Sequence, residues 1–408
     1  MKKSLVFALL ALLSTGCMAQ KSNVRKAENL ALADAPDFAG ARTAIRAALE
    51  DEETKDQAKT WYIAGLIGYQ QNQVEYQKLQ LNKGGKDYML RGSAVLESYN
   101  YWIHADELAM TPVYDKKGKA KYDTRTRRMI AEKMVEYFER GELINYANEL
   151  CGKEDYAKAY EAFNAYISLP DLEMMQERNL QARMPKDTTY DAFVLNTGWA
   201  AFNAKMYDEA IAVFRGLMDR DVRPVVSAQF IYQSYINRND SAQANAFLDE
   251  CIDRFPTEAW FLQNRLNNLV NAGNMDEALV LIDKALANNE QVQYLILKAS
   301  IYDVQGKYEE AIAVYDRALQ IAPDNADVWY SYGVVYVEIA NQLNDRASYM
   351  SAKEFNLARV EINETLKKAL PYFEKAYELN PEDYTYKRQL RSLYYRLGMN
   401  DKYEALAD

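Results

Sequence analysis

Small residues recur along the chain at a nearly constant interval. Ala210, Ala244, Ala278 and Ala311 follow one another at intervals of about 34 residues, and a similar pattern of large and small residues surrounds each of them. A period of this length accommodates one pair of antiparallel helices and is typical of stacked helical hairpins. Because each hairpin in such a stack contacts only its neighbours, the period predicts an all-α repeat solenoid.

The clearest repeat unit covers residues 292–325. Gly306 permits a turn between its two helices, and Pro323 ends the second helix. The residues that mark one face of each helix are Leu295, Ala299, Tyr302, Tyr308, Ala311, Tyr315 and Ala318. Alanine fits where helices cross closely, and aromatic rings fill the space between hairpins. In size, period and helix breaker the unit resembles a tetratricopeptide repeat, which implies a right-handed α-solenoid of stacked antiparallel helix hairpins.

Related units extend over most of the chain. They are most regular over residues 191–408, where a helix pair from Tyr384 onward is expected to cap the stack. Residues 20–190 hold more divergent hairpins, among them one whose first helix contains Gly65. Two insertions, Asp171 to Tyr190 and Asn341 to Thr365, interrupt the period. The pattern predicts roughly eight hairpins in total.

The N-terminal residues have the composition of an export signal. Two lysines precede an apolar run over residues 5–13, which is too short to span a membrane. Two cleavage sites are open. Small residues near Ala19 suit signal peptidase, which would make 1–19 the signal and release a periplasmic or secreted chain. The tetrapeptide ending at Cys17 resembles a lipobox except at Ser14. Cleavage there, after residue 16, would leave Cys17 as the lipidated end of an outer-membrane lipoprotein.

Two cysteines remain after either cleavage besides Cys17. Cys151 and Cys251 belong to hairpins that another hairpin separates. A disulfide requires Cα atoms within about 7 Å, so we expect two free thiols. Cys251 occupies a small packing position of a second helix, which predicts a buried, unreactive thiol.

No catalytic or metal-binding pattern stands out in the sequence. The chain has one histidine, His104, and it lacks an HExxH motif, paired cysteine and histidine ligands, a glycine-rich phosphate loop and an EF-hand loop. A formal net charge of −10 argues against nucleic acid as a partner. We therefore expect a noncatalytic protein that uses no metal, cofactor or nucleic acid.

Function is expected on the surface that the repeats create. In tetratricopeptide-repeat proteins the first helices line a concave groove, which receives an extended peptide or a partner helix. The candidate groove residues are Asn196, Trp199, Gln229, Gln233, Trp260, Gln263, Asn264, Asn267 and Gln293. Primary amides match the donors and acceptors of a peptide backbone, and tryptophan holds apolar side chains. These residues predict a cell-envelope scaffold that binds a protein or extended peptide, or they are ordinary polar residues facing solvent.

A set of asparagines repeats with the same period. Asn203, Asn237 and Asn271 are evenly spaced and are expected at the end of each first helix. Side-chain amides at a helix end commonly bond to backbone groups of the last turn. We interpret these asparagines as structural.

One segment opposes the acidic character of the chain. Residues 116–128 contain seven basic residues and one acid. The basic residues are Lys116, Lys117, Lys119, Lys121, Arg125, Arg127 and Arg128. They are candidates for binding anionic lipid headgroups, lipopolysaccharide or an acidic partner; alternatively, the segment is a solvated loop with a turn at Gly118. Apart from this segment, membrane attachment is expected only through Cys17.

A second class of function places the site in the insertions. An enzyme or carbohydrate-binding accessory protein would use the repeats as a framework, with tyrosine and tryptophan rings stacking on sugars. The scaffold interpretation is favoured because the sequence contains no recognisable catalytic constellation.

Overall fold

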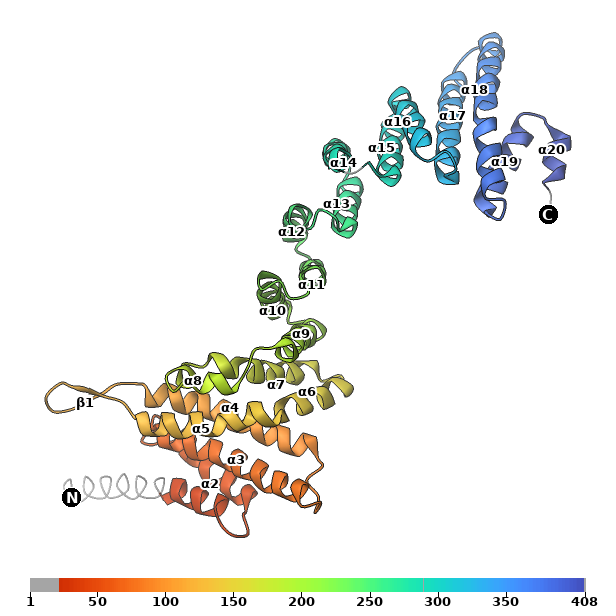
Figure 1. The fold of residues 1–408 in the computed structure, drawn as a ribbon. Helices are drawn as coiled ribbons and strands as arrows, with labels where there is room; N and C mark the ends of the chain where they lie inside the picture. Colours follow the sequence, from red (N-terminus) through yellow and green to blue (C-terminus); the bar gives the residue numbers. More distant parts are fainter. Residues whose placement is uncertain (1–21, 289, 407–408) are drawn as a thin grey trace, which may run out of the picture. The chain divides into compact units, whose positions relative to one another are not determined.

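The computed structural model describes residues 22–288 and 290–406, so the predicted signal segment and Cys17 lie outside the described residues. The described chain is mostly helical, and one two-stranded sheet occurs within it. Its contacts divide it into two compact units, Met1–Phe255 and Pro256–Asp408 (Figure 1). The boundary expected at residue 190 concerns the regularity of the repeats and stays a prediction.

The first unit consists of antiparallel helices joined by short turns. Residues 22–31 are helical. The helices that follow are α2 (Phe38–Glu50), α3 (Ala58–Gln80), α4 (Tyr88–Ala109), α5 (Thr124–Arg140), α6 (Glu142–Gly152), α7 (Tyr156–Ser168), α9 (Thr188–Asn203), α10 (Tyr207–Asp219), α11 (Pro224–Asn237) and α12 (Ser241–Arg254). A β-hairpin between α4 and α5 pairs β1 (Val113–Tyr114) with β2 (Ala120–Lys121). Between α7 and α9 lie η1 (Leu169–Asp171), α8 (Glu173–Gln176) and η2 (Leu180–Arg183).

The predicted period sets the core of the regular hairpins. Ala210 and Ala244 are fully buried, as expected for residues at close helix crossings. Asp187 and Asp240 cap α9 and α12 by accepting hydrogen bonds from backbone amides of the first turn. The first helices α9 and α11, and α13 (Ala259–Asn271) of the second unit, end at the asparagines that recur with the repeat period, which confirms their predicted position.

A glycine of the first helix packs against an aromatic ring of the second helix in three hairpins. A Cβ atom at Gly198 would lie 2.8 Å from the Phe214 ring, and one at Gly333 would lie 2.9 Å from the Phe373 ring. In the longer α3–α4 pair, a Cβ at Gly65 would lie 2.3 Å from the Trp102 ring. The divergent hairpin is thus packed like the regular ones, which confirms the first helix predicted around Gly65.

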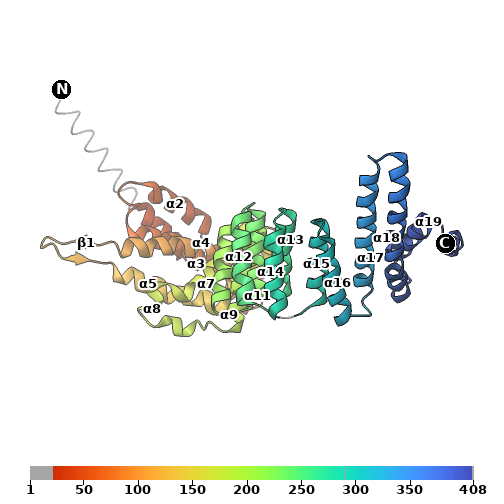
Figure 2. The same ribbon diagram turned by 90° about the horizontal axis from the view of Figure 1, so that it is seen from above.

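The second unit continues the hairpin pattern. Its helices are α13 (Ala259–Asn271), α14 (Met275–Asn288), α15 (Val292–Val304), α16 (Tyr308–Ile321), α17 (Ala326–Ala347), α18 (Ala352–Leu379), α19 (Tyr384–Arg396) and α20 (Asn400–Ala405). The helices α15 and α16 have 13 and 14 residues, whereas α17 and α18 have 22 and 28. The insertion predicted at 341–365 therefore lengthens two helices instead of forming a long loop (Figure 2).

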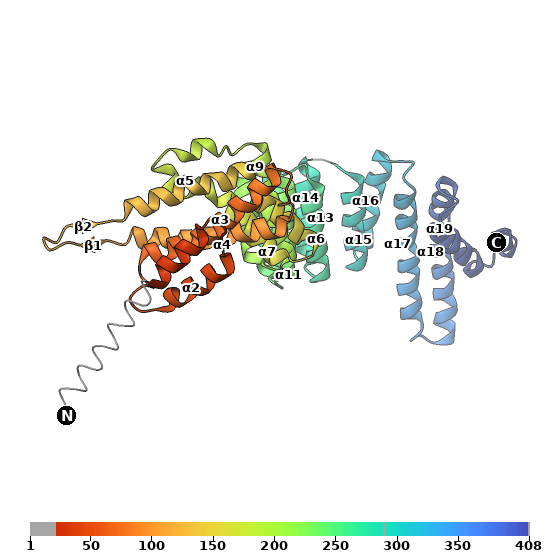
Figure 3. The same cartoon turned by 90° about the horizontal axis from the view of Figure 1, so that it is seen from below.

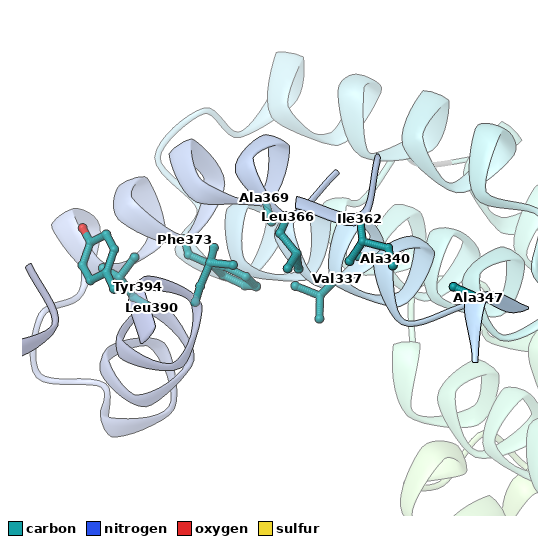
Figure 4. Packing of buried hydrophobic residues seen from close by; sticks show 10 residues of the cluster. Val337, Ala340, Ala347, Ile362, Leu366, Ala369, Phe373, Leu390 and Tyr394 are labelled. Carbon is teal, nitrogen blue, oxygen red and sulfur yellow. The ribbon is translucent and has the colours of Figure 1, made fainter. Parts of the chain in front are cut away.

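The predicted C-terminal helix pair is present as α19 and α20. Leu390 and Leu393 of α19 are each 2% exposed and belong to one core cluster with Phe373 of α18 (Figure 4). The Tyr394 hydroxyl donates a 2.7 Å hydrogen bond to Glu374 of α18. Burying each of these leucines stabilises the end of the stack by about 2 kcal/mol.

Candidate protein-binding surfaces

Four of the predicted groove residues lie on two first helices of the first unit. Asn196 and Trp199 belong to α9, and Gln229 and Gln233 belong to α11. Asn196, Trp199 and Gln233 are exposed, and Gln229 is half-buried. We call these four residues the α9–α11 surface. Its side chains are accessible to a partner, as a binding role requires.

The tryptophan of this surface is held by a neighbouring ring. Trp199 is 38% exposed, and its ring lies edge-on to Tyr156 of α7, with centroids 5.5 Å apart. This arrangement leaves part of an apolar ring open while restricting its motion. Tyr156 is the first residue of α7. Its role beside Trp199 has no signal in the sequence, because the two residues come from different hairpins.

Amide side chains of α9 and α11 form hydrogen bonds within their own helices. The Gln233 side-chain amide donates to the Asn237 side-chain oxygen at 3.1 Å, one turn further on. The Asn203 amide donates to the Trp199 carbonyl at 2.8 Å, which agrees with its predicted role at a helix end. Each amide retains donor or acceptor capacity for a peptide backbone beyond these single bonds.

The other five groove candidates lie in the second unit. Gln263 and Asn267 of α13 and Gln293 of α15 are exposed, and Trp260 is half-buried against Phe261 with ring centroids 5.2 Å apart. Asn264 is half-buried, and its amide donates to the Trp260 carbonyl at 2.7 Å. One donor of the Asn264 amide is therefore used within α13. The exposed amides of Gln263 and Asn267 are more accessible to a partner.

The basic segment forms an exposed hairpin followed by the start of α5. The antiparallel strands place Val113 opposite Lys121 and Tyr114 opposite Ala120. Lys116, Lys117 and Lys119 are exposed in the connecting turn, and Figures 1 and 3 show this hairpin extending away from the helices of its unit. Arg125 and Arg128 are exposed on the first turns of α5. We call residues 113–121 the basic hairpin.

One member of the predicted basic set is not a surface residue. Arg127 is 4% exposed, so its assignment to anionic-partner binding is corrected. Its guanidinium forms ion pairs with Glu177 at 3.1 Å, Glu173 at 3.2 Å and Asp106 at 3.6 Å. The cause is helical periodicity, because Arg127 precedes the buried Ile130 by one helical turn and shares its inward face.

Arg127 connects α4 and α5 to the segment that precedes α9. We call residues 171–187 the strap. Two further ion pairs hold the strap to α5, Arg178 to Glu132 at 3.3 Å and Arg183 to Glu139 at 2.6 Å. Burial raises the pKa of Asp106, and the nearby Arg127 opposes that rise. The predicted insertion is thus a packed structural element.

Comparison with known families agrees with the hairpin geometry. Residues 300–339, which span parts of α15, α16 and α17, match a family model described as a TPR repeat. This segment of the second unit is therefore similar to a tetratricopeptide repeat. The nine groove candidates lie on first helices of hairpins, at positions that precede the matched residues. No curated protein matches the sequence.

Solved tetratricopeptide-repeat structures resemble the chain at low identity. A TPR repeats protein from Bacteroides fragilis is 17% identical over 62% of this chain and 96% of its own, with a TM-score of 0.31. MamA from Desulfovibrio magneticus is 20% identical over 44% of this chain and 86% of its own, with a TM-score of 0.31. An IFIT1 monomeric mutant is 17% identical over 94% of this chain and 77% of its own, with a TM-score of 0.36. At these values the likeness says nothing about partners.

The histidine and the two cysteines of the described chain lie in surroundings that suit a role in packing. His104 of α4 lies 3.0 Å from a Glu107 oxygen, and its ring packs edge-on against Trp61 with centroids 4.2 Å apart. Cys151 and Cys251 are both free thiols, and Cys251 is fully buried as predicted. Burial raises the pKa of the Cys251 thiol to about 12, which keeps it protonated and unreactive at neutral pH.

Metal-binding and membrane-spanning features are absent from the part of the chain that the structure describes. No group of three or more histidine, cysteine, aspartate or glutamate side chains is placed there to hold a metal ion. No helix in the described part is both long enough and apolar enough to cross a bilayer.

Three exposed side chains around the basic hairpin were not predicted from the sequence. Val113, Tyr114 and Tyr122 are 71%, 66% and 47% exposed. Val113 and Tyr114 form β1 and Tyr122 follows β2, so the three side chains lie on either side of the lysines along the chain. Large apolar side chains at this exposure, beside a cluster of positive charge, make the hairpin a second candidate interaction surface.

Proposed function

We propose that the chain is a noncatalytic scaffold of the cell envelope that holds an extended polypeptide on the first helices of its tetratricopeptide repeats. The observation that carries the proposal is the exposure of one repeat position. Trp199, Gln233 and Asn267 occupy this position on α9, α11 and α13, one repeat period apart, and all three side chains are exposed. A packing role alone would not keep large or amide side chains exposed there.

The chemistry of this position suits a backbone ligand. A primary amide offers a donor and an acceptor together, which pairs with the N–H and C=O groups of an extended chain whatever its sequence. Trp199 adds an apolar ring, supported by Tyr156, on which a side chain can rest. The proposed ligand is therefore an extended segment, recognised mainly through its backbone.

The envelope location rests on the N-terminal sequence. Lys2 and Lys3 followed by an apolar run have the form of an export signal. Cleavage after Ala19 would give a periplasmic or secreted scaffold, whereas lipidation of Cys17 would tether it to the outer membrane. Labelling of cells with a radioactive fatty acid distinguishes these two forms. Only the lipoprotein becomes labelled, and the substitution Cys17→Ser should abolish its labelling.

The first test is affinity capture from an envelope extract with the chain that begins at Gln20. The variant Gln233→Ala with Asn267→Ala removes one amide from the equivalent position in each unit. We expect the wild type to retain a defined protein and the variant to bind it about thirtyfold more weakly, since two hydrogen bonds contribute about 1 kcal/mol each. Mass spectrometry identifies what is retained.

A matched variant controls for general loss of surface amides. Gln243→Ala with Asn356→Ala removes one glutamine and one asparagine from exposed positions of the second helices α12 and α18. Capture by this control should equal that of the wild type. Equal capture by all three proteins would exclude the first-helix amides as the binding surface.

The carbohydrate alternative makes a distinct prediction. It places ring-stacking side chains in the insertions, where Tyr349 between α17 and α18 is 93% exposed. A glycan array that shows clean binding by the wild type and loss in Tyr349→Ala would favour this function. Protein capture lost in the amide variant favours the scaffold.

A further inference from the structure

The tip of the basic hairpin is an ordered turn. The Asp115 amide donates to the Lys119 carbonyl at 3.0 Å, and the Gly118 amide donates to the Asp115 carbonyl at 2.9 Å. Gly118 has φ of +73°, a left-handed conformation that glycine adopts without steric cost. The lysines of the tip are therefore presented by a defined turn.

One carboxylate stabilises this turn from within. The Asp115 side chain accepts backbone hydrogen bonds from Lys119 at 3.0 Å and Lys117 at 2.9 Å. These bonds hold the pKa of Asp115 below its ordinary value, so the turn keeps its negative partner at neutral pH. The same carboxylate lies 3.6 Å from the Lys121 ammonium, which leaves Lys121 partly neutralised.

The remaining lysines of the tip have no acidic partner within the described chain. None of the described carboxylates forms an ion pair with the ammonium groups of Lys116, Lys117 or Lys119. Four lysines against one aspartate make the hairpin positive, whereas the whole chain carries −10. An anionic surface would attract the hairpin and repel the acidic body, and this asymmetry would orient the molecule.

The exposed apolar side chains distinguish between anionic partners. Val113 shares a strand pair with Lys121 and Tyr114 with Ala120, so each face of the hairpin carries one large apolar side chain. Tyr122 follows β2 directly. An acidic protein surface would match the lysines but would leave these side chains in a polar environment. The boundary between headgroups and acyl chains accommodates both, since tyrosine sits at that depth and lysine reaches the phosphates.

We propose that the basic hairpin docks the chain onto a membrane surface rich in anionic lipid, with Lys116, Lys117 and Lys119 on the headgroups and the Tyr114 face of the hairpin at the acyl boundary. This contact is separate from the first-helix surfaces and would leave them free for a protein partner. It is also separate from lipidation at Cys17. The scaffold function and the docking contact can therefore fail independently.

Vesicle sedimentation with the chain that begins at Gln20 tests the proposal without a lipid anchor. Wild type should bind vesicles of phosphatidylcholine and phosphatidylglycerol in equal parts, should not bind phosphatidylcholine alone, and should bind more weakly at higher salt. The triple variant Lys116→Gln, Lys117→Gln and Lys119→Gln should lose about a hundredfold in affinity, because each lysine near an anionic surface contributes roughly fivefold.

A control variant of equal charge keeps the test specific. Lys59→Gln, Lys83→Gln and Lys86→Gln removes three exposed lysines elsewhere in the first unit. Its affinity for the anionic vesicles should remain within about twofold of wild type. Equal binding by wild type and the hairpin variant, or no vesicle binding by wild type, would overturn the proposal. Circular dichroism establishes that each variant is folded.

A second variant separates lipid from an acidic protein. Tyr114→Ser retains all the charges and should lower vesicle affinity about tenfold, because one partly buried aromatic ring is lost. Polyglutamate serves as the acidic polypeptide. If this variant bound vesicles like wild type while the lysines were required for polyglutamate binding, the partner would be an acidic protein and the lipid proposal would be wrong.

Discussion

The basic hairpin and the strap both interrupt the repeats of the first unit, and they use their charges in opposite ways. In the strap, Arg178 and Arg183 pair with glutamates of α5. In the hairpin, Lys116, Lys117 and Lys119 face solvent without an acidic partner among the described residues. An insertion whose charges are satisfied internally serves the fold, whereas one whose charges remain open is available for a ligand.

The two insertions differ in the same way in their apolar side chains. Met174 and Met175 of the strap are 2% and 0% exposed. Val113 and Tyr114 of the hairpin are mostly exposed. Burial of a methionine contributes about 2 kcal/mol, so the strap adds to the stability of the first unit while the hairpin adds little. The comparison predicts that substitutions in the strap network change stability and substitutions in the hairpin change binding.

The largest expected effect on stability comes from Arg127→Ala. The substitution leaves Asp106, whose side chain is 16% exposed, without its buried partner, while Glu173 and Glu177 can be resolvated. We expect the free energy of unfolding of the first unit to fall by about 3 kcal/mol. Urea denaturation followed by circular dichroism measures the change. The exposed neighbour Arg128→Ala should change it by less than about 0.5 kcal/mol, and equal effects of the two substitutions would contradict the assigned network.

The effect of Arg127→Ala should depend on pH. Burial raises the folded-state pKa of Asp106 above its ordinary value of 3.8, so the folded protein loses stability as pH rises through that raised pKa. Removing Arg127 takes away the charge that opposes the rise, and the loss becomes larger. The difference between wild type and variant should therefore be greatest at neutral pH and shrink as pH falls and Asp106 becomes protonated. Adding Asp106→Asn to Arg127→Ala should remove this pH dependence. If the stability difference between wild type and Arg127→Ala did not vary with pH, the destabilisation would come from lost packing and not from the charge on Asp106.

The sequence predicted the helical hairpins because packing repeats with a fixed period. Ala210, Ala244 and Ala311 are fully buried where the spacing placed them, and the terminal helix pair from Tyr384 is present. Gly65 against Trp102 shows that the prediction extends into the divergent region, since the close approach of two helices still requires a glycine there.

The sequence did not predict how the insertions are used. Arg127 looked like its basic neighbours, and its burial depends on acids from α4 and the strap that are distant in the chain. Tyr156 beside Trp199 likewise depends on contact between two hairpins. Composition within a segment predicts neither pairing. The identity of a protein ligand is also absent from the periodic positions, because those positions are selected for packing.

The smallest expected effect on stability comes from replacing the basic hairpin. The Asp123 amide donates to the Ala109 carbonyl at 2.9 Å, so the end of α4 and the start of α5 already meet at the base of the hairpin. A short glycine–serine link in place of residues 112–121 should therefore close without strain and retain Asp123 as the cap of α5. We expect the free energy of unfolding to stay within about 0.5 kcal/mol of wild type.

The same replacement should abolish binding to phosphatidylglycerol vesicles while capture of the protein partner is unchanged. Urea denaturation and vesicle sedimentation on one protein measure the two properties together. A loss of stability like that of Arg127→Ala would show that the hairpin supports the fold as the strap does, and the contrast between the two insertions would be lost. Stability retained with binding lost would mean that the hairpin's exposed side chains serve a ligand, because nothing within the described chain would then account for their exposure.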